Sequence, residues 1–399
     1  MSKTIAINAG SSSLKWKLYQ MPEEKVLASG QVERIGQDDA IFSIEKGSGE
    51  KYREILPIID HEKAVEKVLD NLTALHIIEN LEEITGVGHR IVAGGELFQH
   101  SVEVDDHVID QIESIVEFAP LHNGANAMGI RAFKHILPQA TSVAVFDTAF
   151  HQTMPEVNYL YSIPFDYYEK YGARRYGAHG TSHRYVSYRA AEILNKPLEE
   201  LKIVSAHLGN GSSITAIKEG KSFDTSMGFT PLAGLTMGTR CGDIDASLVG
   251  YIMNKEGIKD INEMVHILNY ESGLQGLSGI SNDMRDIEEA AASGNHRAQI
   301  ALDIYEDRVV KYIGQYATTM GGLDVLIFTA GIGENATVMR ENIVNKLKLF
   351  GAEINKDANN VRGKETIIST KDSKVAVLLI PTDEELMIAR DVQSFIDQK

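Results

Sequence analysis

The pattern of apolar and polar positions predicts two similar hairpins, one near each end of the first 220 residues. Residues 4–8 are rich in β-forming residues, residues 9–13 are turn formers, and residues 14–19 alternate with a period of two. The same succession returns over residues 202–217, where the turn reads Gly-Asn-Gly-Ser-Ser. A single repeat at so long a spacing indicates duplicated domains and not a solenoid.

Further strands and helices are expected along the rest of the chain. Helical spacing of apolar residues marks 61–79, 124–135, 284–321 and 381–394. Short β-rich runs lie at 26–32, 40–44, 87–92, 141–146, 324–329 and 375–380. The internal repeat alone places a domain boundary near residue 150.

Composition narrows the class of protein. The 399 residues are 43% hydrophobic and 24% charged, an ordinary globular balance that excludes disorder and collagen-like repeats. The 39 Lys and Arg against 56 Asp and Glu give a net charge of −17. This charge disfavours nucleic acid and anionic membranes as partners. The single cysteine, Cys241, and the lack of a signal-like or membrane-spanning run predict a cytoplasmic protein.

The two Gly/Ser turns carry the first chemical signal. Successive backbone N–H groups and hydroxyls in such turns can hold phosphate oxygens, and Lys15 adds a positive charge beside the first one. An ordinary hairpin is the alternative, since Gly and Ser are common turn residues.

A third glycine segment follows the strand at 324–329. Gly331, Gly333 and Ala336 fit the G-x-G-x-x-A dinucleotide fingerprint, with Glu353 at the usual distance. The segment could instead hold the nucleotide of a kinase, or be a plain strand-to-helix turn. A Walker P-loop is excluded, because Thr215 stands where Gly220-Lys221-Ser222 would need its first glycine.

Charged and imidazole side chains supply the remaining candidates. His179 and His183 are spaced like a zinc pair, but Gly180 replaces the Glu of H-E-x-x-H, which favours a hydrogen-bonding role for His179. Arg90 and Asp147 end apolar strands, where α/β folds place ligands, although a surface ion pair would need the same residues.

Two more charged segments have both a functional and an ordinary interpretation. Arg240 lies between glycines, which leaves room for an anion, although it too could form a surface ion pair. The acids Glu384 and Glu385 open the last helix, where they would also stabilise its dipole.

Seven motifs in order resemble those of acetate kinases over essentially the whole chain. They are residues 8–15, 176–183, 207–211, 238–245, 283–285, 331–335 and 384–385.

The resemblance implies an α/β fold of two duplicated actin-like (ribonuclease H-like) domains flanking a nucleotide cleft. Residues 1–150 with the C-terminal helix 383–399 would form the first domain. Residues 151–382 would form the second, with nucleotide-binding segments and the surface for homodimer formation. The implied reaction is ATP + acetate = ADP + acetyl phosphate by direct in-line transfer, with Mg²⁺ as cofactor and Mn²⁺ as a possible substitute.

The resemblance also assigns roles to residues at matching positions. Asn8 and Glu384 would bind the metal, and Asp147, His179 and Arg240 would be catalytic. Arg90 would bind the carboxylate, with Val92, Leu121 and Pro231 around the acetate methyl group. ATP would be bound by Lys15, His207, Leu208, Gly209, Asn210, Gly211, Asp283, Met284, Arg285, Gly331, Ile332, Gly333, Glu334 and Asn335.

Chemistry limits the role of Asp147. Acetate is already an anion at neutral pH and needs no general base, so holding Mg²⁺-bound water or orienting an Arg suits Asp147 better.

Two alternatives to acetate phosphorylation remain. Ala178 stands where the family commonly has Phe, so a propionate or other short-chain carboxylate kinase is the first. A nucleotide-gated protein of the actin or Hsp70 kind is the second, although Arg90 and Arg240 argue for an anionic second substrate.

Overall fold

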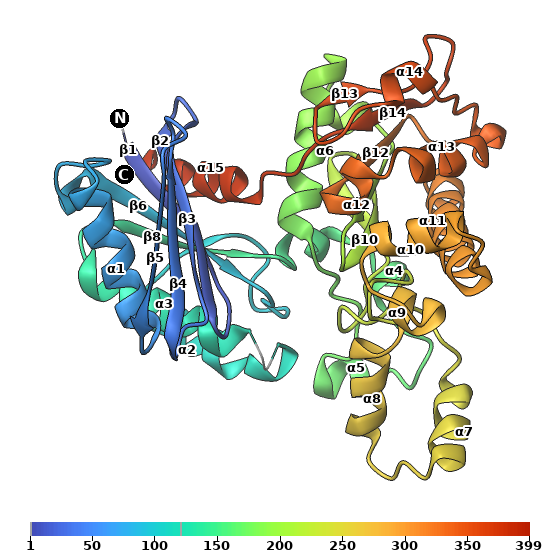
Figure 1. The fold of residues 1–399 in the computed structure, drawn as a ribbon, viewed down its shortest axis with the longest axis horizontal. Coiled ribbons are helices and arrows are strands. Elements are labelled where there is room, and N and C mark those ends of the chain that lie inside the picture. Colours follow the sequence, from blue (N-terminus) through green and yellow to red (C-terminus); the bar gives the residue numbers. More distant parts are fainter. Residues whose placement is uncertain (1, 120–121) are drawn as a thin grey trace. The chain divides into compact units, whose positions relative to one another are not determined.

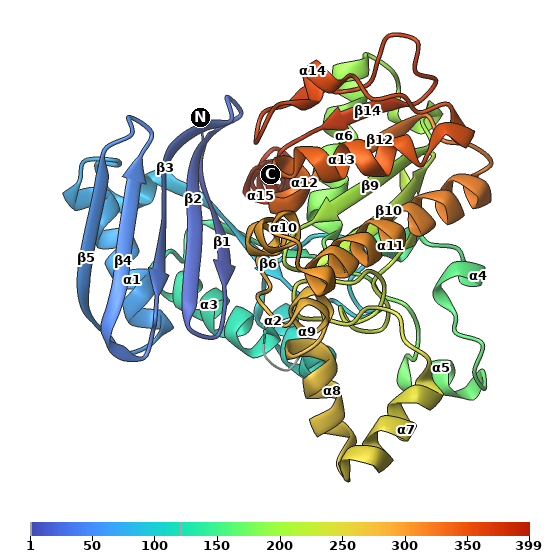
Figure 2. The ribbon, with the colours of Figure 1, turned by 45° about the vertical axis from the view of Figure 1, so that its right-hand side comes forward.

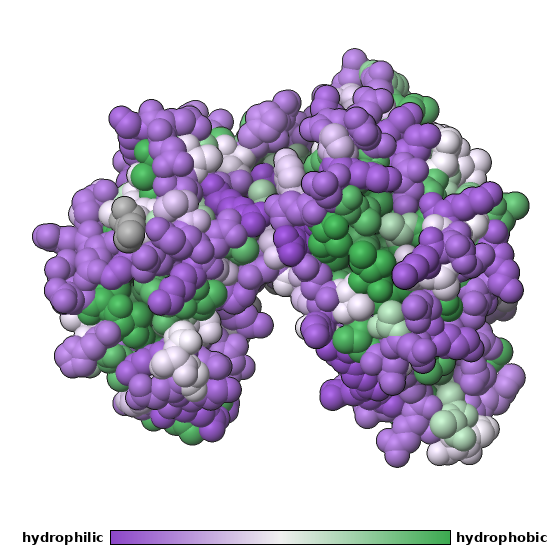
Figure 3. All heavy atoms as spheres, turned by 90° about the horizontal axis from the view of Figure 1, so that it is seen from above, coloured by the Kyte–Doolittle hydropathy of each residue, from purple (hydrophilic) through white to green (hydrophobic). Residues whose placement is uncertain are grey.

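The computed structural model describes residues 2–119 and 122–399. The chain divides into two compact units, Met1–Phe150 with Asp383–Lys399 (unit 1) and His151–Thr382 (unit 2), so unit 2 is an insertion within unit 1. Each unit has its own sheet (Figure 1). Each unit also has its own hydrophobic core. Hydrophilic residues cover most of the face seen in Figure 3.

The sheet of unit 1 has the order β5-β4-β3-β2-β1-β6-β8-β7. Its strands are β1 (Ser2–Ala9), β2 (Ser13–Met21), β3 (Lys25–Glu33), β4 (Gln37–Lys46), β5 (Lys51–Ile58), β6 (Ile84–Ile91), β7 (Val102–Glu103) and β8 (Thr141–Phe146). Strands β1 to β5 form an antiparallel meander, whereas β6 runs parallel to β1 and β8 parallel to β6.

Helices cover both faces of this sheet. They are α1 (His61–Ala74), α2 (Asp106–Ser114), α3 (Asn123–Ile136) and α15 (Glu384–Ile396). On β1, Ile5 and Ile7 share a core with α1 and α3, whereas Ala6 packs in the cluster that includes α15. Burial on both faces explains why β1 reads as an almost continuous apolar run.

The approach of α15 to β6 depends on glycine. A Cβ at Gly86 would lie 2.5 Å from Val392 Cγ1, and a Cβ at Gly88 would lie 2.3 Å from Ile388 Cγ2. Both distances are well inside van der Waals contact, so a larger residue at either of these two positions would push the helix away.

The sheet of unit 2 has the order β11-β10-β9-β12-β14-β13. Figure 2 labels its central strands β10, β9, β12 and β14. Its strands are β9 (Ile203–Leu208), β10 (Ser212–Lys218), β11 (Lys221–Thr225), β12 (Val325–Thr329), β13 (Thr366–Ile367) and β14 (Ala376–Leu379). Its longer helices are α6 (Gly180–Leu194), α7 (Ala246–Glu256), α8 (Ile261–Tyr270), α10 (Met284–Ala292), α11 (His296–Met320) and α13 (Thr337–Asn345). Its short helices are α4 (Glu156–Tyr159), α5 (Asp166–Tyr171), α9 (Gly273–Ser278), α12 (Ala330–Asn335) and α14 (Lys356–Asn359).

The two sheets share one topology. The order β3-β2-β1-β6-β8 in unit 1 corresponds to β11-β10-β9-β12-β14 in unit 2. In both, the first three strands are antiparallel and the last two run parallel to the central one. The matching hairpins are β1–β2 and β9–β10, so the duplication predicted from the two turn sequences is confirmed.

Several predicted boundaries are wrong in detail. The helix expected over 61–79 ends at Ala74, because the chain turns at His76 with a φ of 54°. By contrast, the helices expected over 284–321 are confirmed as α10 and α11, which are separated at Gly294 with a φ of 90°. The glycine segment at 331–335 is helical and forms most of α12 instead of an open turn.

Candidate active site

In unit 1, the candidate residues gather at the carboxyl ends of the parallel strands. Asn8 near the end of β1 pairs directly with Lys15 on β2. Arg90 lies near the end of β6, and Asp147 follows β8 immediately. Because parallel strands end at the same edge of a sheet, this is where α/β folds bind ligands.

Arg90 and Asp147 form a bidentate ion pair. Arg90 Nε lies 3.0 Å and Nη2 2.6 Å from Asp147 Oδ2, and Asp147 is 1% exposed. The second carboxylate, Glu384, lies 3.8 Å from Arg90 Nε. A paired, buried carboxylate of this kind fixes the plane of the guanidinium, as expected if Asp147 orients Arg90.

Burial and charge act together on the cluster of Arg90, Asp147 and Glu384. Burial alone would lower the pKa of Arg90, but the carboxylates of Asp147 and Glu384 raise it, so the guanidinium stays charged. Burial raises the pKa of Glu384 to about 7, opposed by Arg90 and assisted by Asp147. The cluster therefore holds more negative than positive charge, which a cation would relieve.

The donor set in unit 1 fits Mg²⁺. The Glu384 carboxylate and the Asn8 amide offer oxygen atoms, which Mg²⁺ prefers. Residues 2–119 and 122–399 contain no group of three or more His, Cys, Asp or Glu side chains that could hold a metal. Mg²⁺ is usually bound through one or two carboxylates, water and substrate phosphates, so a small protein donor set is adequate.

Beside the cluster, the chain after β6 is fixed by two buried asparagines. The Val92 N–H donates to Asn126 Oδ1 at 3.2 Å, and the Ala93 N–H donates to Asn123 Oδ1 at 3.2 Å. Val92 is therefore held next to Arg90, as a lining residue for a small acid requires. Leu121, the other predicted lining residue of unit 1, lies outside the described residues.

In unit 2, the corresponding strand ends carry the predicted nucleotide segments. His207 and Leu208 end β9, and Gly209, Asn210 and Gly211 form the turn into β10. His207 pairs in parallel register with Thr329, the last residue of β12. The segment Gly331–Asn335 follows directly, so both segments reach the same edge of the sheet.

The hydroxyls of the second turn do not serve as phosphate donors, contrary to the expectation from its sequence. Ser212 and Ser213 are fully buried. Ser212 Oγ lies 2.9 Å from Gly209 O and 3.0 Å from Tyr305 Oη, and Ser213 Oγ lies 2.8 Å from both His179 Nδ1 and His183 Nε2. Their hydrogen-bonding capacity is used inside the protein, and backbone N–H groups remain the candidate donors.

His179 and Arg240 converge on Gly211. A Cβ built on Gly211 would lie 3.3 Å from Arg240 Nη1 and 3.8 Å from His179 Nε2. Arg240 Nη1 contacts the Pro231 carbonyl at 3.3 Å, and within the described residues it forms no ion pair. Burial lowers the pKa of Arg240. A half-buried cation without a carboxylate suits an anionic ligand.

The loop that carries Arg240 is closed at its base. The Asp243 N–H donates to the Gly234 carbonyl, and the Gly234 N–H donates to Asp243 Oδ1 at 2.8 Å. Gly238 lies so close to Asn210 that a Cβ would meet its Oδ1 at 1.9 Å. The loop and the β9–β10 turn are thus packed against each other.

The third predicted nucleotide segment joins the same turn. Asn282 Nδ2 donates to Asn210 Oδ1 at 3.3 Å, and Asp283 caps α10 through the Arg285 N–H. Arg285 pairs with Asp283 on the surface, whereas Met284 is buried. Unit 2 therefore brings residues 207–211, 238–240 and 282–285 together.

Backbone strain marks two candidate positions. His179, immediately before α6, has a φ of 57°, and Ala330, which opens α12, has a φ of 65°. Non-glycine residues in the left-handed region are unfavourable by about 1–3 kcal/mol and cluster at functional sites. Glu334 in α12 accepts from the Thr382 N–H at 3.4 Å, and burial raises its pKa.

His179 and His183 do not form a zinc pair. Both ring nitrogens of His183 lie within 2.9 Å of serine hydroxyls, and its ring is fully buried. Burial lowers the pKa of His183 well below its usual range. This arrangement agrees with a hydrogen-bonding role for His179.

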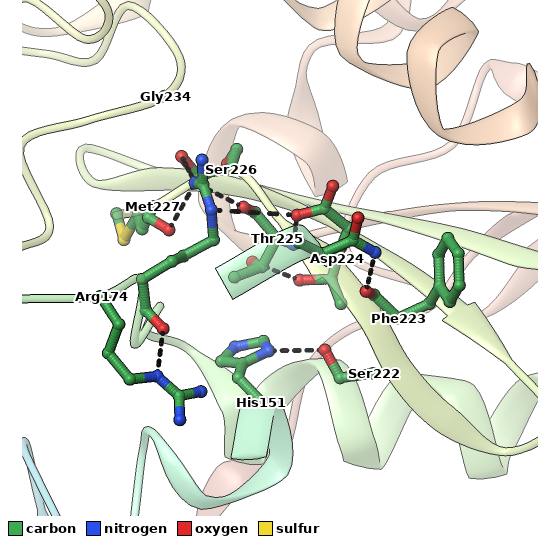
Figure 4. A network of polar contacts seen from close by, with 12 residues as sticks. His151, Arg174, Ser222, Phe223, Asp224, Thr225, Ser226, Met227 and Gly234 are labelled. Carbon is green, nitrogen blue, oxygen red and sulfur yellow. Dashed lines mark hydrogen bonds and ion pairs between the residues drawn. The ribbon is translucent and has the colours of Figure 1, made fainter. Parts of the chain in front are cut away.

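Ala178 is enclosed by other side chains. It forms a small buried cluster with Met227 and Met237, and its carbonyl accepts from His151 Nε2 at 2.8 Å. His151 Nδ1 in turn lies 2.8 Å from Ser222 Oγ (Figure 4). Methionine thus occupies space that a larger residue at position 178 would need.

Two arginines that support residues 225–227 and helix α12 were not predicted from the sequence. Arg175 Nη1 donates to the carbonyls of Thr225, Ser226 and Met227, next to Ala178. Arg340 is fully buried and donates to the Gly333 carbonyl of α12 at 2.8 Å. No local pattern distinguishes such arginines from surface ones, because most of their carbonyl partners lie 19 or more residues away in sequence.

Comparison with known proteins identifies related sequences and structures. The sequence matches the profile of the Acetokinase family over residues 3–390. An acetate kinase of Enterococcus faecalis is 62% identical over 98% of this chain and 99% of its own length. The crystal structure of Porphyromonas gingivalis acetate kinase has a TM-score of 0.95 at 46% identity, covering 99% of this chain and 100% of that one.

A kinase for a different acid is also similar. The crystal structure of a propionate kinase from Francisella tularensis subsp. tularensis has a TM-score of 0.91 at 42% identity. The match covers 99% of this chain and 100% of that chain.

Proposed function

The chain belongs to the acetokinase family, and on that premise we propose how its residues transfer a phosphoryl group between ATP and acetate. It is a phosphotransferase with a carboxylate acceptor, and its two units have the duplicated actin-like fold. The observation that carries the proposal is the convergence of Arg240 and His179 on Gly211, where no described carboxylate pairs with the guanidinium. Two donors around a glycine leave space for a phosphoryl oxygen.

The acceptor requires orientation and not activation. Acetate is ionised at neutral pH, so no proton has to be removed before attack. Arg90 would hold the carboxylate, and Asp147 would keep the Arg90 guanidinium in its plane through the two hydrogen bonds to Oδ2. Val92, Leu121 and Pro231 would surround the methyl group.

Charge stabilisation would come from unit 2. Phosphoryl transfer depends on positioning and on neutralising charge that develops on the equatorial oxygens. We propose that Arg240 and His179 Nε2 donate to such oxygens. Backbone N–H groups of 207–211 and the segments 283–285 and 331–335 would hold ATP, together with Lys15 of unit 1.

We propose Mg²⁺ as the cofactor, with Mn²⁺ able to substitute, held by Asn8 and Glu384. When bound, the ion would supply further positive charge to the phosphates. Burial raises the pKa of Glu384 to about 7, and a bound cation would favour its ionised form.

Propionate is the second candidate acceptor, supported by Ala178 and by the propionate kinase of similar structure. Incubation with ATP, Mg²⁺ and carboxylates of one to four carbons, with hydroxylamine to trap the acyl phosphate, tests both. Trapped product that depends on acetate confirms acetate kinase activity. ATP loss without trapped product would instead indicate a nucleotide-gated protein.

We further propose that the enzyme is a cytoplasmic homodimer. No helix in the described parts of the chain is long and apolar enough to cross a membrane. Unit 2 exposes large apolar side chains on α4, α5, α7 and α8, including Val157, Tyr171, Tyr251 and Ile261 at 83%, 68%, 59% and 51% exposure. Light scattering coupled to gel filtration would distinguish a dimer from a monomer.

A further inference from the structure

A buried chain of hydrogen bonds lies behind His179. His179 Nδ1 is 2.8 Å from Ser213 Oγ, and Ser213 Oγ is 2.8 Å from His183 Nε2. His183 Nδ1 is in turn 2.9 Å from Ser205 Oγ. Ser213, His183 and Ser205 are all fully buried, so no bulk water competes for these bonds.

The protons along this chain can be assigned from the partners available. Because its ring is completely desolvated, His183 is neutral and carries a single proton. If that proton were on Nδ1, it would be donated to Ser205, and the Ser205 hydroxyl proton would have no acceptor among the described side-chain contacts. Such a buried, unused donor costs about 1–3 kcal/mol.

If the proton of His183 is on Nε2 instead, every donor in this chain of hydrogen bonds has an acceptor. Ser205 then donates to His183 Nδ1, His183 Nε2–H donates to Ser213, and Ser213 donates to His179 Nδ1. The last bond requires a lone pair on Nδ1, so the proton of neutral His179 is on Nε2. This nitrogen and its neighbour Cε1 would each lie 3.8 Å from a Cβ built on Gly211, and Arg240 Nη1 would lie 3.3 Å from the same Cβ.

We propose that Ser213, held by His183, is a positioning residue that fixes His179 as the neutral tautomer protonated on Nε2. His179 then donates a hydrogen bond to the transferred phosphoryl group without being an imidazolium. This inference rests on the proposed phosphoryl transfer for its kinetic consequence, but the tautomer is a property of the resting protein.

The tautomer can be measured directly. Long-range ¹H–¹⁵N correlation spectra of the full-length, histidine-labelled protein distinguish protonated from unprotonated ring nitrogens, and loss of signals in His179→Gln assigns the residue. We expect Nε2 protonated and Nδ1 unprotonated at pH 8. A proton on Nδ1, alone or with one on Nε2, would overturn the proposal, even if the enzyme is fully active.

Kinetics test the positioning role. Ser213→Ala should lower kcat about 10- to 100-fold, the range seen when the hydrogen-bond partner that orients a metal-bound histidine is removed. The KM values for ATP and acetate should stay within about twofold, because the His179 contact forms mainly in the transition state. In a His179→Ala background, Ser213→Ala should cause no further loss.

A matched control removes another buried hydroxyl from the same strand. Thr215 lies two residues further along β10. Within the described residues, its hydroxyl bonds only to the Thr225 hydroxyl on the neighbouring strand β11. Thr215→Val should leave kcat within about threefold. Equal losses for the Thr215 and Ser213 variants, or a further loss in the His179→Ala background, would indicate a merely structural role. If the wild-type protein forms no acyl phosphate, the proposed function fails while the spectra still decide the tautomer.

Discussion

A methyl group at Gly211 would test the convergence of Arg240 and His179. Gly211 has no left-handed φ that would bar a side chain. The Cβ of alanine would lie 3.3 Å from Arg240 Nη1 and 3.8 Å from Cε1 and Nε2 of His179. Gly211→Ala therefore keeps both donors and fills the space between them.

The size of the effect follows from these distances. A donor acts on a developing charge when it lies about 2.7–3.1 Å from the oxygen. A carbon within 4 Å of both donors occupies the volume that an oxygen needs in order to reach them. Loss of a single donor of this kind lowers kcat about 10²- to 10³-fold, so we expect kcat of Gly211→Ala to fall at least ~100-fold.

The assay is acyl phosphate trapping under saturating ATP and acetate, together with thermal unfolding. Gly314 in α11 is the control, because a Cβ there meets nothing within 4 Å and should leave activity unchanged. A Gly211→Ala enzyme with the wild-type melting temperature and less than a fivefold loss of kcat would refute the assignment of this space to the phosphoryl group.

Three further predictions concern charge, specificity and pH. Arg240→Ala and Arg90→Ala should each lower turnover about 10³-fold or more with folding intact, and Lys should restore little because it lacks the planar fork. Ala178→Phe should raise the ratio of kcat/KM for acetate over propionate, because the ring adds bulk beside Met227 and Met237 and would narrow the proposed methyl pocket. His89→Gln should weaken the acid sensitivity of folding. Burial lowers the pKa of His89 to about 3, whereas the unfolded residue titrates near 6.5. Between these values only the unfolded chain gains the proton, so the wild type should lose about 2 kcal/mol more than the variant between pH 7 and pH 5.

Each of these three predictions can be contradicted by a single result. A loss of under tenfold for both alanine variants would reject the roles of the two arginines. An unchanged acetate-to-propionate ratio would mean that position 178 does not border the methyl pocket. For His89, denaturant unfolding at both pH values should give different losses for the two proteins, since Gln can keep the bond to Ser142 without titrating. Equal losses would contradict the reasoning.

The repeated hairpins were predictable because their residues encode them locally. Strands β1, β2, β9 and β10 are apolar or alternating runs separated by Gly and Ser, and the structure contains each of them. Strand β5 was missed because it lies at the sheet edge, and only its last residue, Ile58, is buried. An edge strand with mostly exposed residues has no periodic signal to detect.

The chemistry of single side chains was less accessible to sequence reasoning. Ser213 looks like a phosphate donor in its Gly/Ser turn, yet its hydroxyl lies between two histidines that precede it by about 30 residues. Likewise, the pairing of Gly234 with Asp243 shapes the Arg240 loop through tertiary hydrogen bonds. Such contacts depend on the completed fold, so a pattern can propose the residue but not its partner.

The position of α15 in the chain has a consequence for synthesis on the ribosome. The first 150 residues form most of unit 1, but α15 is translated only after all of unit 2. This helix supplies Glu384 and covers β6 at Gly86 and Gly88. Until then, the apolar face formed by Ala6, Val143 and Val145 has no covering helix. A nascent chain stalled within unit 2 would therefore present an exposed sheet face, a surface that chaperones recognise and that favours aggregation.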